Sequence, residues 1–410
     1  MNDETSLNSS HSLGPLEDDM VVAIVGGGPS GSGCAIALLK LAKQKGVNVK
    51  VIIFEGKVFK KSQHYNQCAG VLSPPLDKIL TDDLKLDFPY DMTQKVIDGY
   101  ILHGLENSIV LNGDHAPSHA VRRVNFDEYL LHTAENRGAE LVQARVTDIE
   151  IQTDGVRIYA ENGNYKADVV VGAFGLDDGT GKLFERDTPY QQPRFLNAIV
   201  TKIHPDEEFM NNFGFNIHAF LPIAKEIEFG AVTPKLNHLT INIAGSEVNT
   251  IQMDKFLNLS EVREVLPPSD TWDSNELNYY KGRFPIGLAK GYYGDRYVIL
   301  GDAAGMVRPF KGKGINSGIL TGIRAATVML ENGISRKAFK HYVRMCSKLT
   351  NDMPYGKVLR FLTLRLAKMK MMDPVIELAG KRRDVAKMLF DCVSANDSIK
   401  NVYIHMLKHN

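Results

Sequence analysis

The sequence contains few of the residues that build metal centres or disulfide networks. Among its 410 residues there are four cysteines and one tryptophan. The cysteines have no Cys-x-x-Cys spacing and stand at Cys34, Cys68, Cys346 and Cys392. This scatter argues against a zinc site and a disulfide network, and it favours a reducing compartment. His115 and His119 lie in a Gly/Pro/Ser loop without the spacing of a metal signature, so we expect no metal.

The sequence also lacks a charge imbalance, a membrane-spanning run and a targeting segment. Its 48 basic and 48 acidic side chains cancel, which removes a general attraction to nucleic acid. No apolar run reaches the length of a transmembrane helix. Residues 1–19 are rich in Ser, Asn and acidic residues and lack the basic start and apolar centre of a signal peptide. We therefore expect a disordered N-terminal segment and a cytoplasmic protein.

A glycine-rich turn between a strand and a helix organises the chain. The apolar residues 21–25 lead into Gly26-Gly27-Gly28-Pro29-Ser30-Gly31, and an apolar helix follows. Gly26, Gly28 and Gly31 match the Gly-x-Gly-x-x-Gly fingerprint of dinucleotide sites. There the first glycine permits the turn, the second lets the backbone approach a pyrophosphate, and the third lets the helix pack close to the strand. The helix N-terminus then faces the phosphates.

An acidic residue follows the next buried strand, residues 49–54. This residue is Glu55. A carboxylate at the end of the second strand is the group that binds a ribose diol in such folds. The order strand, turn, helix, strand and acid therefore predicts a bound dinucleotide.

Two segments in the first third of the chain leave alternatives open. Residues 64–75 contain Cys68, Gly70 and two prolines, which indicates a loop of fixed shape. It is either a functional loop beside a cofactor or a plain connection with a free thiol. Arg122 and Arg123 precede a helix, where they serve either an anion or the solvated surface.

A second glycine-rich loop follows a buried strand late in the chain. Residues 298–300 are apolar, and Gly301-Asp302 comes directly after them. Gly312 and Gly314 then lead into a helix. Ligands of open α/β sheets bind beside such strand ends, so this loop predicts a second part of the same site.

The patterns predict an α/β fold in which a discontinuous Rossmann-like domain encloses an inserted domain. The cofactor domain takes residues 20–95, 120–185 and 285–334. The substrate domain takes residues 96–119 and 186–284, where short alternating runs from 195 onward indicate an antiparallel sheet. Strands are expected at 96–102 and 109–111. Residues 335–410 form a helical region.

The C-terminal helical region is basic. Residues 354–390 contain nine Lys or Arg and three acidic residues, interleaved with Leu, Met and Val. A basic amphipathic helix can lie on a membrane surface. A helical cap with a solvated basic face explains the same pattern, and the residues alone favour that reading.

Three motifs occur together in this chain: the N-terminal Gly-x-Gly-x-x-Gly, the late Gly-Asp with its Gly-x-Gly loop, and an Arg-x-x-Phe-Asp helix at Arg123–Asp127. Together they resemble the FAD-dependent family that contains geranylgeranyl reductases and p-hydroxybenzoate hydroxylase. The sequence Gln-Cys-Ala-Gly-Val-Leu-Ser-Pro at 67–74 is similar to the Cys-x-Gly loop of the geranylgeranyl reductase branch. Residues 389–394 are similar to that branch's C-terminal region. The resemblance spans roughly residues 20 to 400.

The resemblance implies an FAD cofactor and a set of site residues. The implied cofactor-binding residues are Gly26, Gly28, Pro29, Ser30, Gly31, Glu55, Gly70, Arg123, Val146, Gly301, Asp302, Gly312, Gly314, Ile315 and Asn316, and the implied catalytic residue is Cys68. Glu55 would bind the adenosine ribose, and Val146 would offer its backbone to adenine. Arg123 and Asp302 would contact the phosphate or ribityl region. Residues 312–316 would place a helix N-terminus against the flavin pyrimidine ring, where reduced flavin carries negative charge.

At two positions the sequence departs from the family pattern, and these departures affect the prediction of the reaction and the substrate rather than that of the cofactor. Phe174 stands where relatives have the Asp of an Ala-Asp-Gly element that helps the hydroxylases handle NADPH, which weakens the hydroxylase reading. Ile217 and Ala219 stand where the reductase branch has the Tyr and Trp of an aromatic Tyr-x-Trp-x-Phe-Pro strand. The identity of the substrate therefore stays open.

We expect an FAD-dependent oxidoreductase that reduces carbon–carbon double bonds of an isoprenoid or similar lipid. A flavin monooxygenase of the same fold and an electron-transfer flavoprotein with a protein partner are the alternatives. The expected partners are a small apolar substrate, NAD(P)H or a ferredoxin-like electron donor, no nucleic acid, and a peripheral membrane contact through the C-terminal helices.

Overall fold

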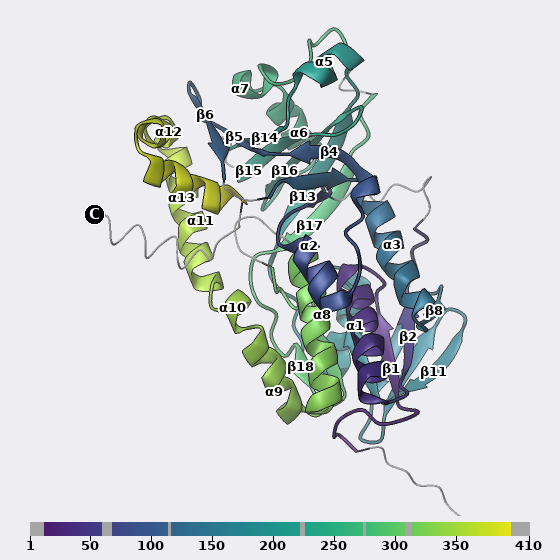
Figure 1. The fold of residues 1–410 in the computed structure, drawn as a ribbon. Coiled ribbons are helices and arrows are strands. Elements are labelled where there is room, and N and C mark those ends of the chain that lie inside the picture. Colours follow the sequence, from purple (N-terminus) through teal and green to yellow (C-terminus); the bar gives the residue numbers. More distant parts are fainter. Residues whose placement is uncertain are drawn as a thin grey trace, which may run out of the picture.

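The computed structural model describes residues 12–59, 68–113, 116–221, 226–273, 276–307 and 314–394 (Figure 1). The helices are α1 (Pro29–Lys45), α2 (Leu76–Lys78), α3 (Arg123–Asn136), α4 (Asp178–Asp187), α5 (Glu207–Asn212), α6 (Thr250–Leu257), α7 (Ser260–Arg263), α8 (Gly314–Glu331), α9 (Arg336–Met345), α10 (Ser347–Thr350), α11 (Met353–Lys368), α12 (Met372–Lys381) and α13 (Arg383–Ser394). A short π-helix, η1 (Ile79–Leu84), and a short 3₁₀-helix, η2 (Tyr90–Met92), follow α2. Within these ranges no helix is long and apolar enough to cross a membrane.

The strands form four sheets. They are β1 (Val21–Val25), β2 (Lys50–Phe54), β3 (Val71–Leu72), β4 (Thr93–Ile97), β5 (Gly99–His103), β6 (Ser108–Asn112), β7 (Ser118–Val121), β8 (Glu140–Val142), β9 (Val146–Ile151), β10 (Val156–Ala160), β11 (Gly163–Ala167), β12 (Val169–Gly172), β13 (Phe195–Ile203), β14 (Asn216–Phe220), β15 (Phe229–Pro234), β16 (Leu239–Gly245), β17 (Tyr280–Pro285), β18 (Tyr293–Gly294) and β19 (Tyr297–Ile299).

The first sheet is mainly parallel and has the order β18-β19-β12-β1-β2-β8. β1 pairs in parallel with β2 on one side and β12 on the other, and β12 pairs in parallel with β19. Both faces of these apolar strands are covered, as parallel sheets require. The sheet thus places β1 and β2, from the N-terminal part of the chain, beside β12 and next to β19, which comes more than 240 residues after β2. The prediction of a discontinuous Rossmann-like α/β unit is confirmed.

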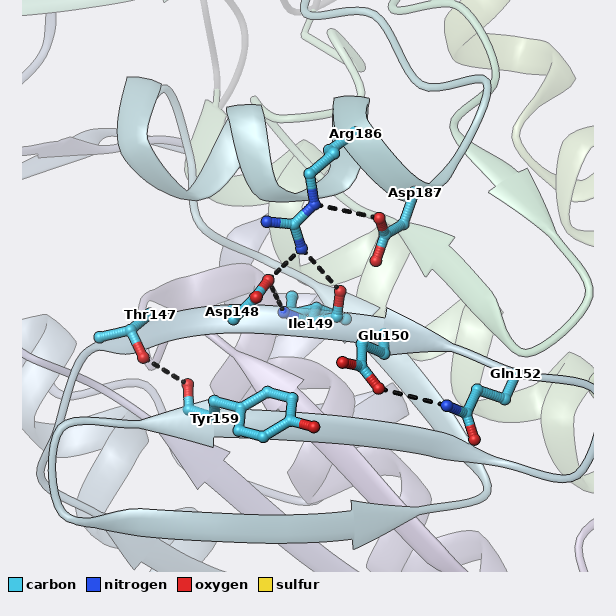
Figure 2. Close-up of polar contacts among 8 residues, drawn as sticks. All are labelled: Thr147, Asp148, Ile149, Glu150, Gln152, Tyr159, Arg186 and Asp187. Atoms are coloured by element: carbon cyan, nitrogen blue, oxygen red, sulfur yellow. Dashed lines mark hydrogen bonds and ion pairs between the residues drawn. The ribbon is translucent and has the colours of Figure 1, made fainter.

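A three-stranded antiparallel sheet, β9–β10–β11, lies beside the parallel sheet and is held against α4. Figure 2 shows the link: Arg186 on α4 reaches Asp148 on β9 and donates to the backbone oxygen of Ile149 at 3.3 Å. Its Nε also donates to Asp187 at 3.1 Å. These contacts are exposed, so they orient the sheet more than they stabilise it.

The third sheet has seven strands in the order β17-β13-β16-β15-β14-β5-β6. Most of its pairs are antiparallel, but β5 pairs in parallel with β14. The predicted strand 96–102 is therefore divided: its first part belongs to β4 in the small sheet β3-β7-β4, and its second part to β5 in the large sheet. The chain changes sheets at Asp98, whose N–H donates to the backbone oxygen of Phe215.

The C-terminal helices pack along the parallel unit and then rise to the edge of the seven-stranded sheet, where α11, α12 and α13 stand beside β5 and β6 (Figure 1). Two polar contacts anchor them. Arg360 on α11 forms an ion pair with Glu228 before β15. The Asp373 carboxylate on α12 accepts three backbone N–H bonds from the β5–β6 turn, at 2.9–3.1 Å. Phe390 on α13 is buried in the cluster that includes Ile217 and Ala219.

The N-terminal segment is packed from residue 12 onward, contrary to the prediction for residues 12–19. Leu16 is 3% exposed, and its N–H donates to the backbone oxygen of Met329 at 3.0 Å. Leu13 accepts a bond from the N–H of Ile334. The composition of this segment is polar, but its two leucines, Leu13 and Leu16, pack at the C-terminal end of α8. Residues 1–11 lie outside the described residues.

α1 and α8 approach each other closely, because glycines line their contact. A Cβ placed at Gly322 would lie 2.6 Å from the backbone oxygen of Ser30 and 2.7 Å from the backbone nitrogen of Cys34. A Cβ at Gly33 would lie 3.2 Å from the Cα of Ile319. Side chains at these positions would separate the two helices.

We expect Gly322→Ala to destabilise the protein by about 1–3 kcal/mol, because the new methyl group meets backbone atoms that cannot move aside. Gly380→Ala on α12 is the matched control, since a Cβ there meets nothing within 4 Å. It should leave the free energy of unfolding unchanged or raise it by up to about 1 kcal/mol. Urea unfolding of the two variants measures both effects. Equal stability of the variants would show that the helix contact tolerates a Cβ.

Candidate functional site

The glycine turn between β1 and α1 has a shape that only glycine permits at two of its three positions. Gly26 has φ +109°, and a Cβ there would lie 2.5 Å from the backbone oxygen of Ala173. A Cβ at Gly31 would lie 1.9 Å from the backbone oxygen of Gly26. Gly28 is different, because its Cβ position faces open space with nothing within 4 Å. The internal packing therefore explains Gly26 and Gly31, whereas the open space at Gly28 agrees with the prediction that a ligand approaches the backbone there.

Ser30 and Gly301 are brought together at the carboxyl ends of β1 and β19. A Cβ at Gly301, which has φ +54°, would lie 2.2 Å from the hydroxyl of Ser30. The N–H of Gly301 donates to the hydroxyl of Thr321 on α8 at 3.1 Å. Pro29 is the first residue of α1 and is buried. The two glycine-rich segments predicted from opposite ends of the chain thus meet at one place.

Glu55 fixes the glycine turn from the end of β2. Its two carboxylate oxygens accept the backbone N–H groups of Gly27 and Lys57, each at 2.8 Å. Each oxygen keeps a lone pair for a further donor, such as a ribose hydroxyl. Val146 begins β9, and its neighbour Arg145 packs against Gly56, where a Cβ would lie 2.3 Å from the Arg145 side chain. Val146 therefore lies near Glu55, on the side predicted for adenine.

Arg123 begins α3 and lies between two acidic groups and a thiol. Its Nε donates to Asp127 at 2.6 Å, and its Nη1 lies 3.7 Å from the sulfur of Cys68. Burial works to lower the pKa of Arg123, but Asp127 and Cys68 outweigh it and raise the value. Burial raises the pKa of Asp127 and of Asp302, and the charge of Arg123 opposes both shifts. Arg123 is therefore held charged beside Asp302 and Cys68.

The start of α8 completes this end of the site. A Cβ at Gly314 would lie 3.1 Å from Oδ1 of Asp302. Asn316 is 6% exposed, and its side-chain amide donates to the backbone oxygen of Ser73 at 3.0 Å, which ties α8 to the loop that carries Cys68. Ile315 is also buried. Gly312 lies outside the described residues, so its predicted role stays a prediction.

The site residues fall into two groups at the carboxyl edge of the parallel sheet. Glu55 and Val146 lie at the β2 and β9 end, while Cys68, Arg123, Asp302 and α8 gather at the other. The glycine turn lies between them. This extended arrangement fits a dinucleotide in which the adenosine half and the flavin half lie on opposite sides of the pyrophosphate.

Phe174 and Lys235 show what lies around these groups. Phe174 stacks against Phe184 with ring centroids 5.2 Å apart, so it fills apolar space at the position where the family resemblance implies an acid. Lys235 was not predicted: it is 5% exposed, and its ammonium donates to the backbone oxygen of Val121 at 2.6 Å. A Cβ at Gly70, which has φ +67°, would lie 3.1 Å from that ammonium. The sequence places Lys235 in a turn between two strands, and nothing in that pattern predicts its burial beside Gly70.

Known proteins resemble the chain along most of its length, although no family model matches it. Digeranylgeranylglycerophospholipid reductase of Methanocaldococcus jannaschii is 23% identical over 373 residues, which cover 84% of this chain and 88% of that protein. The crystal structure of a geranylgeranyl bacteriochlorophyll reductase-like protein of Thermoplasma acidophilum has a TM-score of 0.73 at 17% identity, covering 95% of this chain and 100% of that one. The flavin-dependent brominase Bmp2 has a TM-score of 0.62 at 18% identity, covering 95% and 99%.

The role of Gly28 can be separated from the role of Gly26 by substitution. Gly28→Ala should leave the stability of the FAD-free protein unchanged, since its φ of −70° suits any residue. It should weaken FAD binding about tenfold or more, because the methyl group occupies the space of the pyrophosphate. Gly26→Ala should instead destabilise the protein. Thermal unfolding and FAD titration distinguish the two effects, and unchanged FAD affinity in Gly28→Ala would contradict the assignment.

The comparisons confirm the predicted resemblance and the fold class, and they agree with the predicted oxidoreductase class and FAD cofactor. The brominase shows that the fold alone does not fix the reaction. By sequence and by fold, the chain is similar to the FAD-dependent oxidoreductases that include the geranylgeranyl reductases.

Proposed function

We propose that this protein uses FAD to reduce carbon–carbon double bonds of an isoprenoid or similar lipid. The observation that carries the proposal is the contact of Cys68 with Arg123 beside Asp302, in a chain whose relatives include a reductase named for an isoprenoid lipid. When bound and reduced, FAD supplies a hydride to one carbon of the double bond. The residues of this chain hold the cofactor, exclude water and place a proton for the second carbon.

The chain's own residues divide this work. The turn at Gly26–Gly31 would hold the pyrophosphate, and Glu55 would hold the ribose. Arg123 keeps the sulfur of Cys68 oriented through its Nη1. The thiol of Cys68 then donates the proton, so that hydride and proton together saturate the bond. The thiol regains its proton from water before the next turnover.

The electron donor is NAD(P)H bound transiently or a ferredoxin-like protein. The chain has a single dinucleotide fingerprint, which does not provide a second nucleotide domain. We also propose that the chain is divided into a cofactor domain, an inserted substrate domain and a C-terminal helical region. The substrate would then lie between the seven-stranded sheet and the cofactor.

A flavin monooxygenase is the second candidate, since a flavin-dependent brominase shares the fold. Such an enzyme consumes oxygen in step with its substrate, whereas the reductase does not. Oxygen uptake during turnover therefore distinguishes the two reactions.

Purified protein should bind FAD and show a flavin absorption spectrum. Cys68→Ala should slow alkene reduction about a hundredfold or more, because a general acid contributes at least that much. FAD affinity should change little, since the thiol is not among the groups that hold the phosphates. Stopped-flow oxidation of the reduced protein by geranylgeranyl diphosphate measures the first quantity and FAD titration the second. Full activity of the variant would remove Cys68 from the mechanism.

We further propose that α11 rests on an anionic membrane. Its outward side chains are apolar and exposed: Val358 by 50%, Phe361 by 58%, Leu362 by 44% and, beyond its end, Met369 by 67%. Residues 353–371 contain five Lys or Arg and no Asp or Glu. An apolar face rimmed by cations suits an anionic bilayer surface, from which a lipid substrate enters.

Replacing both Phe361 and Leu362 by Asp should abolish sedimentation with phosphatidylglycerol vesicles, since each apolar side chain contributes about 1.5–3 kcal/mol when buried. Ile251→Asp on α6 is the control, because Ile251 is 59% exposed on a separate surface. Retained vesicle binding in the double variant would reject the membrane face. A change in oligomeric state alone would assign the face to a protein contact.

A further inference from the structure

The turn between β15 and β16 carries a lysine whose side chain is directed into the protein. Pro234 ends β15, and the N–H of Lys235 donates to the backbone oxygen of His238 at 2.9 Å, which closes the turn. Leu236 at the tip of the turn is 71% exposed, whereas Lys235 is 5% exposed. Burial of an ammonium group is costly unless it has partners, so lysines rarely leave water. Lys235 therefore depends on groups inside the protein.

The ammonium of Lys235 joins two segments that lie next to the candidate site. It donates to the backbone oxygen of Val121, the last residue of β7, at 2.6 Å. The N–H of the same Val121 donates to the backbone oxygen of Gly70 at 2.8 Å. The end of β7 is thus bound on one side by the loop that carries Cys68 and on the other by the seven-stranded sheet.

These contacts determine where Cys68 and Arg123 lie, because both residues are close to them in the chain. Cys68 comes two residues before Gly70, and Arg123 comes two residues after Val121. A Cβ at Gly70 would lie 2.5 Å from the backbone oxygen of Val121 and 3.5 Å from the backbone nitrogen of Arg123. The loop therefore lies directly against the start of α3. The 3.7 Å contact between Arg123 and the sulfur of Cys68 depends on this packing.

The charges around Lys235 single out Cys68. In the described part of the chain, the charged groups that act on Lys235 are Cys68, Lys202 and Arg122. The last two are cations and oppose the ammonium. The carboxylates of this region act on Arg123 instead. The thiolate form of Cys68 is therefore the group of opposite charge that faces Lys235 among the described residues.

The pKa of Lys235 agrees with this arrangement. Burial lowers it to about 8, a negative sulfur at Cys68 opposes the shift, and the two cations add to it. A lysine with this pKa is mostly charged at pH 7 and loses its charge within about two pH units above that. A buried charge acts strongly on its neighbours, because water and salt screen it little.

We propose that Lys235 is a positioning residue for Cys68. Its hydrogen bond to Val121 holds the Cys68 loop against the start of α3, and its charge stabilises the thiolate that remains after Cys68 has donated its proton. The inference rests on the proposed function. In that step the S–H bond breaks and its electron pair stays on sulfur, while the electron pair of the double bond takes up the proton. Arg123 on α3 and Lys235 in the β15–β16 turn then face the new negative charge.

Alkylation of the FAD-loaded protein by iodoacetate and by iodoacetamide measures the charge beside Cys68 without turnover. Both reagents react with the thiolate, so the ratio of their rates does not depend on the thiolate fraction. The ratio rises with positive charge near the sulfur, because iodoacetate is an anion and iodoacetamide is neutral. Mass spectrometry of the peptide that contains Cys68 separates this thiol from the others. Cys34 and Cys346 are buried, whereas Cys68 is exposed.

In the wild-type protein the ratio should fall about threefold or more between about pH 7 and about pH 9.5, as Lys235 loses its proton. In Lys235→Met it should be low at both pH values, because the charge is absent. In Lys235→Arg it should stay high at both, because a guanidinium keeps its proton. Lys40→Met is the matched control and should behave like the wild type. The Lys40 ammonium also donates to a backbone oxygen, that of Asp83, but Cys68 is not among the groups that act on it.

Turnover gives a second measurement. Lys235→Met should lower kcat for alkene reduction about tenfold, because the thiolate left by proton donation loses one stabilising charge. KM for the alkene and the affinity for FAD should change little. Lys235→Arg should restore most of the rate, which a purely structural role in a tightly packed turn would not allow.

The outcomes separate the role of Lys235 from the reaction. If the ratio is the same in the wild type and in Lys235→Met, the charge does not act on Cys68 and the assignment is rejected, even where alkenes are reduced. If the ratios differ as expected but no alkene is reduced, the proposed reaction fails and the assignment stands. If the variant shifts only the reduction potential of the flavin, the charge serves the cofactor, which overturns the proposal.

The test remains decisive if Lys235→Met does not fold. The wild-type protein and Lys235→Arg then carry it. A ratio that falls with pH in the wild type and stays constant in Lys235→Arg supports the assignment. A ratio that falls in both proteins, or in neither, rejects it.

Discussion

The close contact of α1 with α8 is the constraint on which the rest of the molecule depends. Gly322 and Gly33 remove the side chains that would separate these helices, and Gly301 lets the hydroxyl of Ser30 approach the end of β19. The contact brings the glycine turn, Asp302 and the start of α8 to one edge of the parallel sheet. Apart from β1 and the helices α9 to α13, every other element lies between α1 and α8 in the chain. The candidate cofactor site is therefore a product of this packing.

Much of the parallel unit could be predicted from the sequence, because its signals are local. An apolar strand, a glycine turn and an apolar helix are adjacent at residues 21–45, and Gly26 and Gly31 each have a steric reason. The same is true of the buried strand before Gly301. The acid at Glu55 follows its strand directly. Residues close in the chain carry these signals, so the pattern is visible without knowing the fold.

Other parts of the molecule could not be predicted to the same depth, because their contacts join distant segments. The run at 96–102 is read as one strand, yet the chain crosses between two sheets at Asp98, where pairing with Phe215 decides the outcome. Lys235 is buried by Val121, more than a hundred residues earlier in the chain. Leu13 and Leu16 look like part of a polar tail until they meet the end of α8. In each case a partner far along the chain determines burial.

The joining of residues near the N-terminus to residues near 320 also sets the order in which the chain folds during synthesis. α1 emerges early, yet its glycine face has no partner until α8 has been made. The β13–β17 strands pair mostly with one another, so their sheet can form before β19 has been synthesised. Half of the candidate FAD site is thus among the first segments synthesised and the other half among the later ones. Any ligand that binds across both halves favours the closed parallel unit by mass action.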